Sequence, residues 1–571
     1  MNNFSAVLAS INAFLWHEYV LYLIVGTGLL FTVWSGFSQY WALRHGPDVV
    51  RGKYDDPDDP GAINHFQALS AALSATVGLG NIGGVALAIA LGGPGAVFWM
   101  WVIGLLGMAI KLTEVTMTML YRNLDDPDNP HGGPMYVASK ILAAKNWPRL
   151  GRTIGIIFCL AMIASTITGG NMFQAWNIGE ITKVYYGVPT WVSGIVLAFI
   201  VGAVILGGIK RIGKFAGTVV PIMVAAYLLT GFWVLFNNVG EIPSMFALIV
   251  TSAFSPAAAG GAFVGGSVFF AFQIGMKRAI FSNEAGQGSS PMVHAAAKTD
   301  EPVREGIVAG LEPFIDTIVV CTFTALIILS TGIWNRAPDV AFQQVPQFVA
   351  SEQGWQLDAL NANDGSWAED DAAFVVISAH DNVQTANSLH KLSGRVLQGD
   401  TGLEIVWSPF TSDVRPEVVS EGYYRNYVGA TLTAKAFDTV TPGLGKWVIV
   451  IASWLFGIST MISWCYYGEQ GVVFMGGEKP VFAYKIFYCI LIIIATLGFV
   501  KTDADLDNYI GIGTGVIMFA NIPIIWMFGY QAMLAYKNYI KRLKSGRIGP
   551  GHPAPHIDDL LTGRDVERRE D

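Results

Sequence analysis

Residues 74–84 read SATVGLGNIGG, and Gly78, Gly80 and Gly83 have the spacing of the G-x-G-x-x-G fingerprint that binds dinucleotide phosphates. That fingerprint works only when a strand leads into the glycines and an acidic residue follows about 20 residues later to bind a ribose hydroxyl. The preceding residues, AINHFQALSAALSATV, are helical in period, and no acidic residue occurs between Gly84 and Glu114. Both flanks therefore argue against a membrane-bound nucleotide enzyme.

The same glycines predict a break in a helix, because each lowers helix propensity by about 1 kcal/mol relative to Ala. A broken helix presents amides with partial positive charge to a carboxylate and carbonyls with partial negative charge to a cation. The alternative is that these small residues only let two helices pack closely. Ser74, Thr76 and Asn81 favour a binding role, since their oxygen atoms would need partners inside the protein.

The elements that carry this stretch are predicted to lie in a membrane. Of the 571 residues, 52% are hydrophobic and 14% are charged, and the mean hydropathy is +0.45, outside the usual range of globular proteins. The net charge of −8 argues against a nucleic-acid partner. The four cysteines lie in apolar runs without C-x-x-C spacing, and the nine histidines lack metal-ligand spacing, so neither type predicts a metal centre.

Eleven stretches are long and apolar enough to cross a bilayer as helices, which takes roughly 20 residues. They lie at about 19–38, 66–91, 94–120, 153–178, 189–208, 214–236, 260–282, 307–333, 444–468, 481–500 and 508–536. Lys and Arg concentrate in the loops at 121–152 and 208–214 and in the C-terminal tail, but none occurs between Phe236 and Gly266. The positive-inside rule then places the N-terminus outside and the C-terminus in the cytoplasm of a plasma (inner) membrane protein.

Setting aside the first span leaves ten spans, which divide into two sets of five. An odd number of spans per half inserts the halves upside down relative to each other, as an inverted repeat requires. The second half should then also start with an interrupted helix, and AGGAFVGGSVFFAFQIG carries Gly260, Gly261, Gly265 and Gly266. The predicted units are 1–64 (extra span and loop), 65–236 (first repeat), 237–259 (outer loop), 260–334 and 425–538 (second repeat), 335–424 (outer insertion) and 539–571 (tail).

The segment 335–424 is acidic and polar, with strand-like stretches such as AAFVVISA and GLEIVW. It is either a small cap that shapes the entrance or an insertion without a role in a tolerant loop. The tail after Ser545 is predicted to be disordered, because it combines Gly and Pro with mixed charges.

Six motifs in consistent order carry a family resemblance: SATVGLGNIGGVALAIALGGPGAVFWMW (74–101), GGPMY (132–136), GGNMFQAWN (169–177), FSNEAGQGSSP (281–291), EPFIDT (312–317) and GISTMISWCYYGEQ (457–470). Together they resemble the alanine or glycine:cation symporter family. The resemblance implies the LeuT-type fold of two inverted five-helix repeats and uptake of small neutral amino acids with sodium or, in some members, protons. VGLGN also resembles the unwound first helix of the neurotransmitter:sodium symporters, which share that fold.

The resemblance implies roles for particular residues. The implied substrate-binding residues are Thr76, Gly78, Gly80, Asn81, Asn171, Gln174, Thr460, Met461 and Trp464. The last three share one helical face by their spacing, and a Trp and a Met at the cavity wall leave room for little beyond a methyl group. The implied sodium ligands are the carbonyls of Ser74 and Val77 and the hydroxyl of Ser459, with Thr460 as the rival hydroxyl.

The remaining charged residues of the predicted spans and their inner ends are read mainly as structural. Lys111 and Glu114 are expected to pair with each other or to extend toward the cytoplasmic surface. Glu284 could latch an inner gate or cap the following turn, and Glu312 and Asp316 are expected to be structural. No carboxylate or His lies in SATVGLGN or GISTMISW, so sodium is favoured over protons. Two features depart from the family pattern: Gln273 stands where a basic residue is expected, and the insertion is unusually long.

The expected function is import of alanine or glycine with sodium by alternating access. The protein is then not an enzyme, needs no cofactor beyond the sodium ion and works as a monomer in the lipid bilayer. A channel or a substrate sensor built on a transporter scaffold is the alternative. The sequence does not rank alanine, glycine and serine, or L against D stereochemistry.

Overall fold

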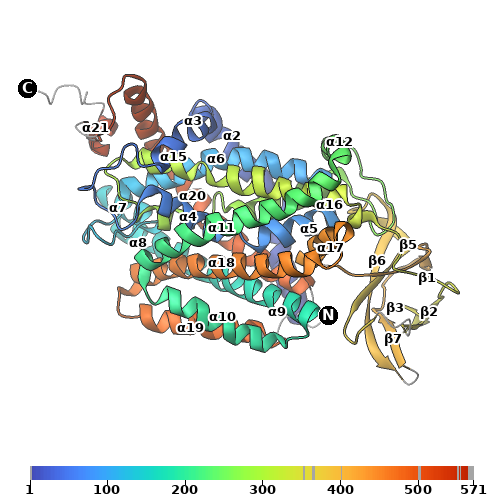
Figure 1. Ribbon diagram of the computed structural model, residues 1–571. Helices are drawn as coiled ribbons and strands as arrows, with labels where there is room; N and C mark the ends of the chain where they lie inside the picture. Colours follow the sequence, from blue (N-terminus) through green and yellow to red (C-terminus); the bar gives the residue numbers. More distant parts are fainter. Residues whose placement is uncertain are drawn as a thin grey trace, which may run out of the picture.

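The computed structural model describes residues 3–351, 354–362, 367–399, 402–427, 429–498, 503–549, 552 and 554–562. Long helices pack side by side in a bundle, and a β-sheet lies at one end of it, while α3, α7 and α21 lie toward the opposite end (Figure 1). A large apolar core extends through the bundle. The fold class expected from the sequence, an all-α polytopic membrane protein with an outer soluble insertion, is confirmed in outline for the helices, but all-α is wrong for the insertion, which is β-structure.

The first half of the chain contains α1 (Asn3–Leu15), α2 (Glu18–Trp34), α3 (Ser38–Val50), α4 (His65–Thr76), η1 (Gly80–Gly84), α5 (Val85–Gly92), α6 (Gly95–Tyr121), α7 (Pro134–Ala144), α8 (Pro148–Ser165), η2 (Thr166–Met172), α9 (Phe173–Tyr186), α10 (Thr190–Ile205), α11 (Gly208–Asn237), η3 (Val239–Glu241) and α12 (Ile242–Ser252). The second half contains α13 (Val268–Asn283), α14 (Pro291–His294), α15 (Pro302–Ala309), η4 (Phe314–Cys321), α16 (Thr322–Ser330), η5 (Ile333–Asn335), α17 (Ala430–Val440), α18 (Leu444–Gly476), α19 (Val481–Ala495), α20 (Asp503–Lys544) and α21 (Ile557–Thr562).

Among the described residues, seven helices are long and apolar enough to cross a membrane, or eight if the bent pair 65–76 and 80–92 is one span. These eight coincide with eight of the eleven expected spans. The other three expected spans correspond to α10, α13 and α19, which have 16, 16 and 15 residues. A multi-pass membrane protein follows from length and composition, whereas the count of eleven stays a prediction.

The first helix of the bundle core is broken where the glycines predict it. A capping box between Asn64 and Gln67 starts α4, and the chain bends by 51° between α4 and the helix that follows. The second half begins with η1, a π-helical turn, and such turns are frequent at functional sites. At Gly83 an added Cβ would lie 2.9 Å from the backbone nitrogen of Ala430, so the close approach of α17 to the break requires glycine there.

The second expected break lies elsewhere in the sequence. Gly260–Gly266 precede α13 and form a loop with short bridges rather than an interrupted helix. The interruption instead follows α13, where Glu284, Gly286 and Gly288 have positive φ angles of 57°, 85° and 69°. The loop is held by the insertion, since the amide of Ala262 donates to the carbonyl of Arg336 at 2.9 Å. This contact joins residues that are far apart in the sequence, so local sequence patterns did not indicate that Gly260–Gly266 form a loop and not a helix break.

The insertion folds as antiparallel β-structure, as its strand-like stretches suggest. Its strands are β1 (Val340–Ala341), β2 (Phe348–Ser351), β3 (Gly354–Leu357), β4 (Leu360–Asn361), β5 (Ala372–Asn382), β6 (Asn387–Gly399), β7 (Gly402–Trp407), β8 (Glu417–Val418) and β9 (Gly422–Arg425). Among the described residues, the larger sheet has the order β1-β9-β5-β6-β7-β4 with β8 beside β5, and β2 pairs with β3. In register, Phe374 of β5 lies opposite Ser393 of β6 and Tyr424 of β9.

Strand β5 faces two apolar clusters because its side chains alternate between the sheet faces. Ala373, Val375 and Ile377 belong to the core of the insertion itself. Phe374 and Val376 lie in a separate cluster with Ala262, Val264 and Tyr424, which joins the sheet to the loop before α13. The insertion is therefore packed against the helical bundle rather than only tethered to it.

The C-terminal tail is partly helical. Helix α20 continues to Lys544, and Ile557–Thr562 form the short helix α21, which contacts α20. The prediction of disorder after Ser545 is therefore wrong for residues 557–562, where a tertiary contact supports a helix, and residues 563–571 lie outside the described chain.

Candidate functional site at the helix break

Three predicted residues from three helices converge at the break. A Cβ built on Gly78 would lie 2.5 Å from Oγ1 of Thr460 and 3.7 Å from Oε1 of Gln174. The Gln174 side chain is buried; its Nε2 donates to the carbonyl of Gly169 at 3.2 Å. Its Oε1 is buried with no hydrogen-bond partner in the described part of the chain. An acceptor oxygen in need of a donor thus faces the backbone of the broken helix.

Asn81 connects the break to a carboxylate that the motif analysis did not place there. Its Oδ1 accepts from the amide of Gly78 at 2.9 Å, and its Nδ2 donates to Oδ1 of Asp316 at 2.6 Å. Asp316 also accepts from the hydroxyls of Ser282 and Thr317, each at 2.8 Å. SATVGLGN and GISTMISW contain no carboxylate, but the carboxylate of Asp316 reaches the break from a third segment, the π-helical η4.

The predicted sodium ligands of α4 and α18 lie together. The carbonyl oxygen of Ser74 accepts from Oγ1 of Thr460 at 3.2 Å and from Oγ of Ser459 at 3.4 Å. In return, Oγ of Ser74 donates to the carbonyl of Ser459 at 2.8 Å. Val77 is fully buried at the bend. Oxygen atoms of this kind suit a hard cation.

Several other predicted residues have partners inside the protein. The hydroxyl of Thr76 donates to the carbonyls of Ala72 and Leu73 in its own helix, at 3.3 and 3.5 Å. Asn171 donates to the carbonyl of Tyr488 at 2.9 Å and so faces α19. Met461 is fully buried, and its carbonyl accepts from the hydroxyl of Tyr488. These contacts are packing contacts in this structure.

Aromatic rings surround the break. Phe281 of α13 lies against Gly80, whose added Cβ would be 3.4 Å from the ring, and packs edge-on against Phe173 with 5.3 Å between ring centroids. Trp464 packs edge-on against Tyr467 and lies so close to Gly170 that an added Cβ there would be 2.5 Å from the Trp464 Cβ. Gln273, the departure noted from the family pattern, donates to the carbonyl of Trp16 instead of facing the break.

A chain of buried charges lies beside the second break. Nζ of Lys111 is 3.1 Å from Oε2 of Glu312, and His294 bridges Glu312 and Glu305 at 2.5 Å on each side. Glu305 also contacts His65. The expectation that Lys111 pairs with Glu114 or extends toward the cytoplasmic surface is therefore wrong, because the Lys111 side chain is buried and pairs with Glu312.

Glu114 has a different set of partners. It accepts from the amides of Gly286 at 2.5 Å and Gly288 at 3.1 Å. The turn after α13 supplies these amides because its backbone leaves the helical conformation there. The donors for the buried carboxyl group of Glu114 thus come from the break itself.

Apolar helices of membrane-spanning length, a helix broken near its middle and convergent polar groups at that break are the features of a membrane transporter. The model of the Sodium:alanine symporter family matches residues 1–367 and 413–551, so the chain belongs to this family. The resemblance seen in the motifs is confirmed, and the family is one of cation-coupled amino-acid symporters rather than enzymes.

Two relatives illustrate this relationship. The chain is 34% identical to the sodium/alanine symporter AgcS of Methanococcus maripaludis, over 86% of this chain and 87% of that protein. It is 32% identical to the amino-acid carrier protein AlsT of Bacillus subtilis, over 71% and 79%. A solved manganese transporter of Eremococcus coleocola covers 89% of this chain and 94% of its own at a TM-score of 0.46 and 11% identity. That TM-score does not define the helix arrangement.

Proposed function

We propose that the protein imports small neutral amino acids, such as alanine and glycine, together with sodium by alternating access. We further propose a LeuT-type arrangement of two inverted five-helix repeats with one extra N-terminal span, the N-terminus outside and the C-terminus in the cytoplasm. Membership of the sodium:alanine symporter family supports coupling to sodium. In this proposal the protein works as a monomer.

The observation that carries the proposal is the unpartnered Oε1 of Gln174 at the break. A carbonyl oxygen there would accept hydrogen bonds from the ammonium group of an amino acid. The amides of the turn at Gly80 begin the second half-helix, so their partial positive charge favours a carboxylate. A Cβ on residue 78 would lie 2.5 Å from Oγ1 of Thr460, so glycine is needed there to keep the backbone of the break beside the Thr460 hydroxyl.

The cation belongs, in this proposal, beside the substrate. The carbonyls of Ser74 and Val77 and the hydroxyl of Ser459 would hold sodium, with Thr460 between the cation and the substrate. Asn81 would orient the break through its bonds to Gly78 and Asp316. The remaining substrate contacts are assigned to Asn171, Met461 and Trp464.

Uptake of labelled alanine into proteoliposomes with an inward sodium gradient tests the function. We expect uphill accumulation that stops when the gradient is dissipated. Gln174→Ala should raise the alanine concentration for half-maximal uptake about tenfold, because it removes one hydrogen bond to a charged group. Gln343→Ala, at an exposed position, is the matched control. Downhill flux alone would identify a channel, and binding without flux a sensor; either outcome contradicts the proposal.

A further inference from the structure

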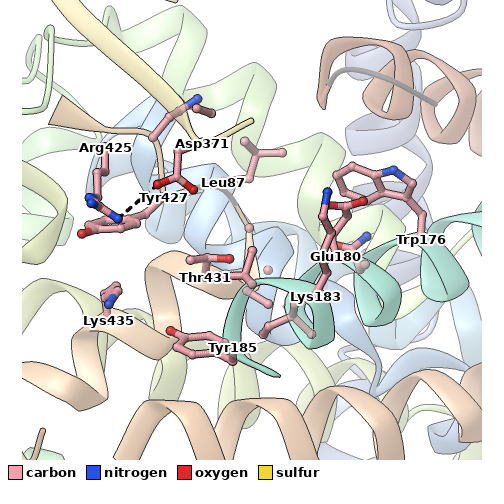
Figure 2. Close-up of a pocket in the computed structure, with 18 of the residues that line it drawn as sticks. Leu87, Trp176, Glu180, Lys183, Tyr185, Asp371, Arg425, Tyr427, Thr431 and Lys435 are labelled. Atoms are coloured by element: carbon pink, nitrogen blue, oxygen red, sulfur yellow. Dashed lines mark hydrogen bonds and ion pairs between the residues drawn. The ribbon is translucent and has the colours of Figure 1, made fainter. Parts of the chain in front are cut away.

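A cavity of about 880 Å³ lies between the β-sheet and the helices α5, α9 and α17 (Figure 2). Gly83, Gly84 and Leu87 of the broken helix line it, so the cavity borders the break. Phe173 also lines it, and this residue is the direct neighbour of Gln174. Phe173 packs edge-on against Phe281, whose ring lies 3.4 Å from a Cβ built on Gly80, so a wall residue of the cavity contacts a ring that borders the break.

The described residues that line the cavity carry a local excess of positive charge. The basic ones are Lys183, Arg278, Arg395, Arg425 and Lys435, and the acidic ones are Glu180, Asp370 and Asp371. This local excess is opposite in sign to the net charge of −8 of the whole chain. A cleft with such lining attracts anionic groups and raises their local concentration.

One side of the cavity suits a carboxylate. Arg425 is held in place by Asp371, with 3.3 Å between Nη1 and Oδ2, and by the ring of Trp367, whose centroid is 4.3 Å from Cζ. Nζ of Lys435 lies 5.5 Å from the ring centroid of Tyr427. The hydroxyl of Tyr185 is buried and has no hydrogen-bond partner within the described chain. Two cations, each paired with a carboxylate (Lys435 with Asp438 at 3.8 Å), and a hydroxyl without a partner in the described chain therefore lie at one cavity.

The opposite side suits an ammonium group. In Figure 2, Arg425, Tyr427 and Lys435 lie along one side, whereas Glu180 and Trp176 of α9 lie across the cavity from them. A carboxylate and an aromatic face are both favourable partners for an ammonium ion. The lining thus offers partners for an anionic group on one side and for a cationic group on the other (Figure 2).

We propose that this cavity is a second, outer binding site for the amino acid, in which Arg425 and Lys435 bind the α-carboxylate and Tyr185 donates its hydroxyl to it. This inference rests on the proposed function, because it assumes that the transported amino acid enters here. The family model passes over residues 368–412, which supply Asp370, Asp371 and Arg395. These three lining residues lie outside the segments that the family model matches, and the insertion has a role in forming the cavity.

An occupant of the outer site would contact the element that touches the break. The strand β9 ends at Arg425, and α17 starts at Ala430, next to Gly83. Oγ1 of Thr433 in α17 donates to the carbonyl of Ile82 at 3.0 Å. The outer site is thus in direct contact with α17, the helix that touches the break.

Protection of a cysteine tests the outer site without relying on transport. Thr431→Cys, at a lining position, is labelled with a membrane-impermeant maleimide in the Gln174→Ala background, where the inner site is weakened. Alanine at about ten times its Kd should slow labelling about tenfold, and alanine methyl ester, which lacks the carboxylate, should not. Equal labelling rates with and without alanine would overturn the proposal. The protein without Thr431→Cys gives the background from native cysteines.

Variants that remove one charge or one hydroxyl from the lining locate the site. In the cysteine background, Arg425→Gln, Lys435→Gln and Tyr185→Phe should each reduce protection, whereas Arg415→Gln and Lys446→Gln, outside the described lining, should keep it. Protection that survives all three lining variants contradicts the assignment. If wild-type uptake fails but protection is seen, the proposed transport fails and the outer site stands; if uptake is normal and protection is missing, only the outer site fails.

Discussion

The side-chain amide of Asn81 donates to the carboxylate of Asp316, with 2.6 Å between Nδ2 and Oδ1, although 235 positions separate the two residues. The bond joins the π-helical turn η1 at the break to the π-helical segment η4. Because Asn81 also accepts from the amide of Gly78, the carboxylate helps to set the backbone conformation at the break.

Replacing Asp316 by Asn should impair transport while leaving the fold intact. The neutral side chain is the same size, but it loses hydrogen bonds to an anion that are worth about 1.5–3 kcal/mol each. We expect sodium-driven alanine uptake per folded protein to fall about tenfold or more, and the Tm in detergent to fall as well, because the lost hydrogen bonds are buried. Asp358→Asn, at an exposed position of the insertion, should retain full uptake. Normal uptake by Asp316→Asn would show that the carboxylate does not position Asn81.

The hydroxyls of α18 should differ in their effect on the sodium requirement. Ser459→Ala removes an oxygen at 3.4 Å from the carbonyl of Ser74 and should raise the sodium concentration for half-maximal uptake. Ser463→Ala is the matched control, because that hydroxyl donates to the carbonyl of Ala71, one turn away. The measurement is alanine uptake at varied sodium. A larger shift for Ser463→Ala than for Ser459→Ala would move the cation site.

Two adjacent glycines should tolerate alanine differently. The new Cβ in Gly83→Ala meets the backbone nitrogen of Ala430 at 2.9 Å, and overpacking of this kind costs about 1–3 kcal/mol. In Gly84→Ala the nearest atom, Cδ of Arg278, is 4.0 Å away. Thermal unfolding in detergent should show a lower Tm for Gly83→Ala alone. Equal Tm values for the two variants would contradict the close contact between α17 and the break.

Breaking the buried charge chain should destabilise the protein. Lys111→Met leaves the buried carboxylate of Glu312 without its lysine, and loss of one partner of a buried pair costs about 3–5 kcal/mol. Lys111→Met combined with Glu312→Gln should regain part of the stability, because the uncompensated charge is removed. The exposed pair Lys53 and Asp48 provides the control, since Lys53→Met should leave Tm nearly unchanged. A Tm equal to wild type for Lys111→Met would show that the pair is not coupled to folding.

Features that depend on local sequence were predictable. The apolar runs that form long helices and the break at Gly78–Gly84 follow from residue hydropathy and helix propensity, which act over a few neighbouring residues. The convergence of Gln174 and Thr460 on Gly78 came from the family motifs rather than from spacing. Strand-like alternation in 335–424 also indicated the β-structure, but not that it packs on the bundle and lines a cavity.

The sequence by itself determined that the chain is a membrane protein, which family it resembles and where its first core helix opens. Only the tertiary structure decided that Asp316 accepts a hydrogen bond from Asn81 and that Glu114 accepts from the turn after α13. It also decided that Gly260–Gly266 form a loop that contacts the insertion. The physical reason is the distance along the chain over which each effect acts. Helix propensity and hydropathy are properties of neighbouring residues, whereas a buried hydrogen bond or ion pair depends on how distant helices rotate and pack against one another.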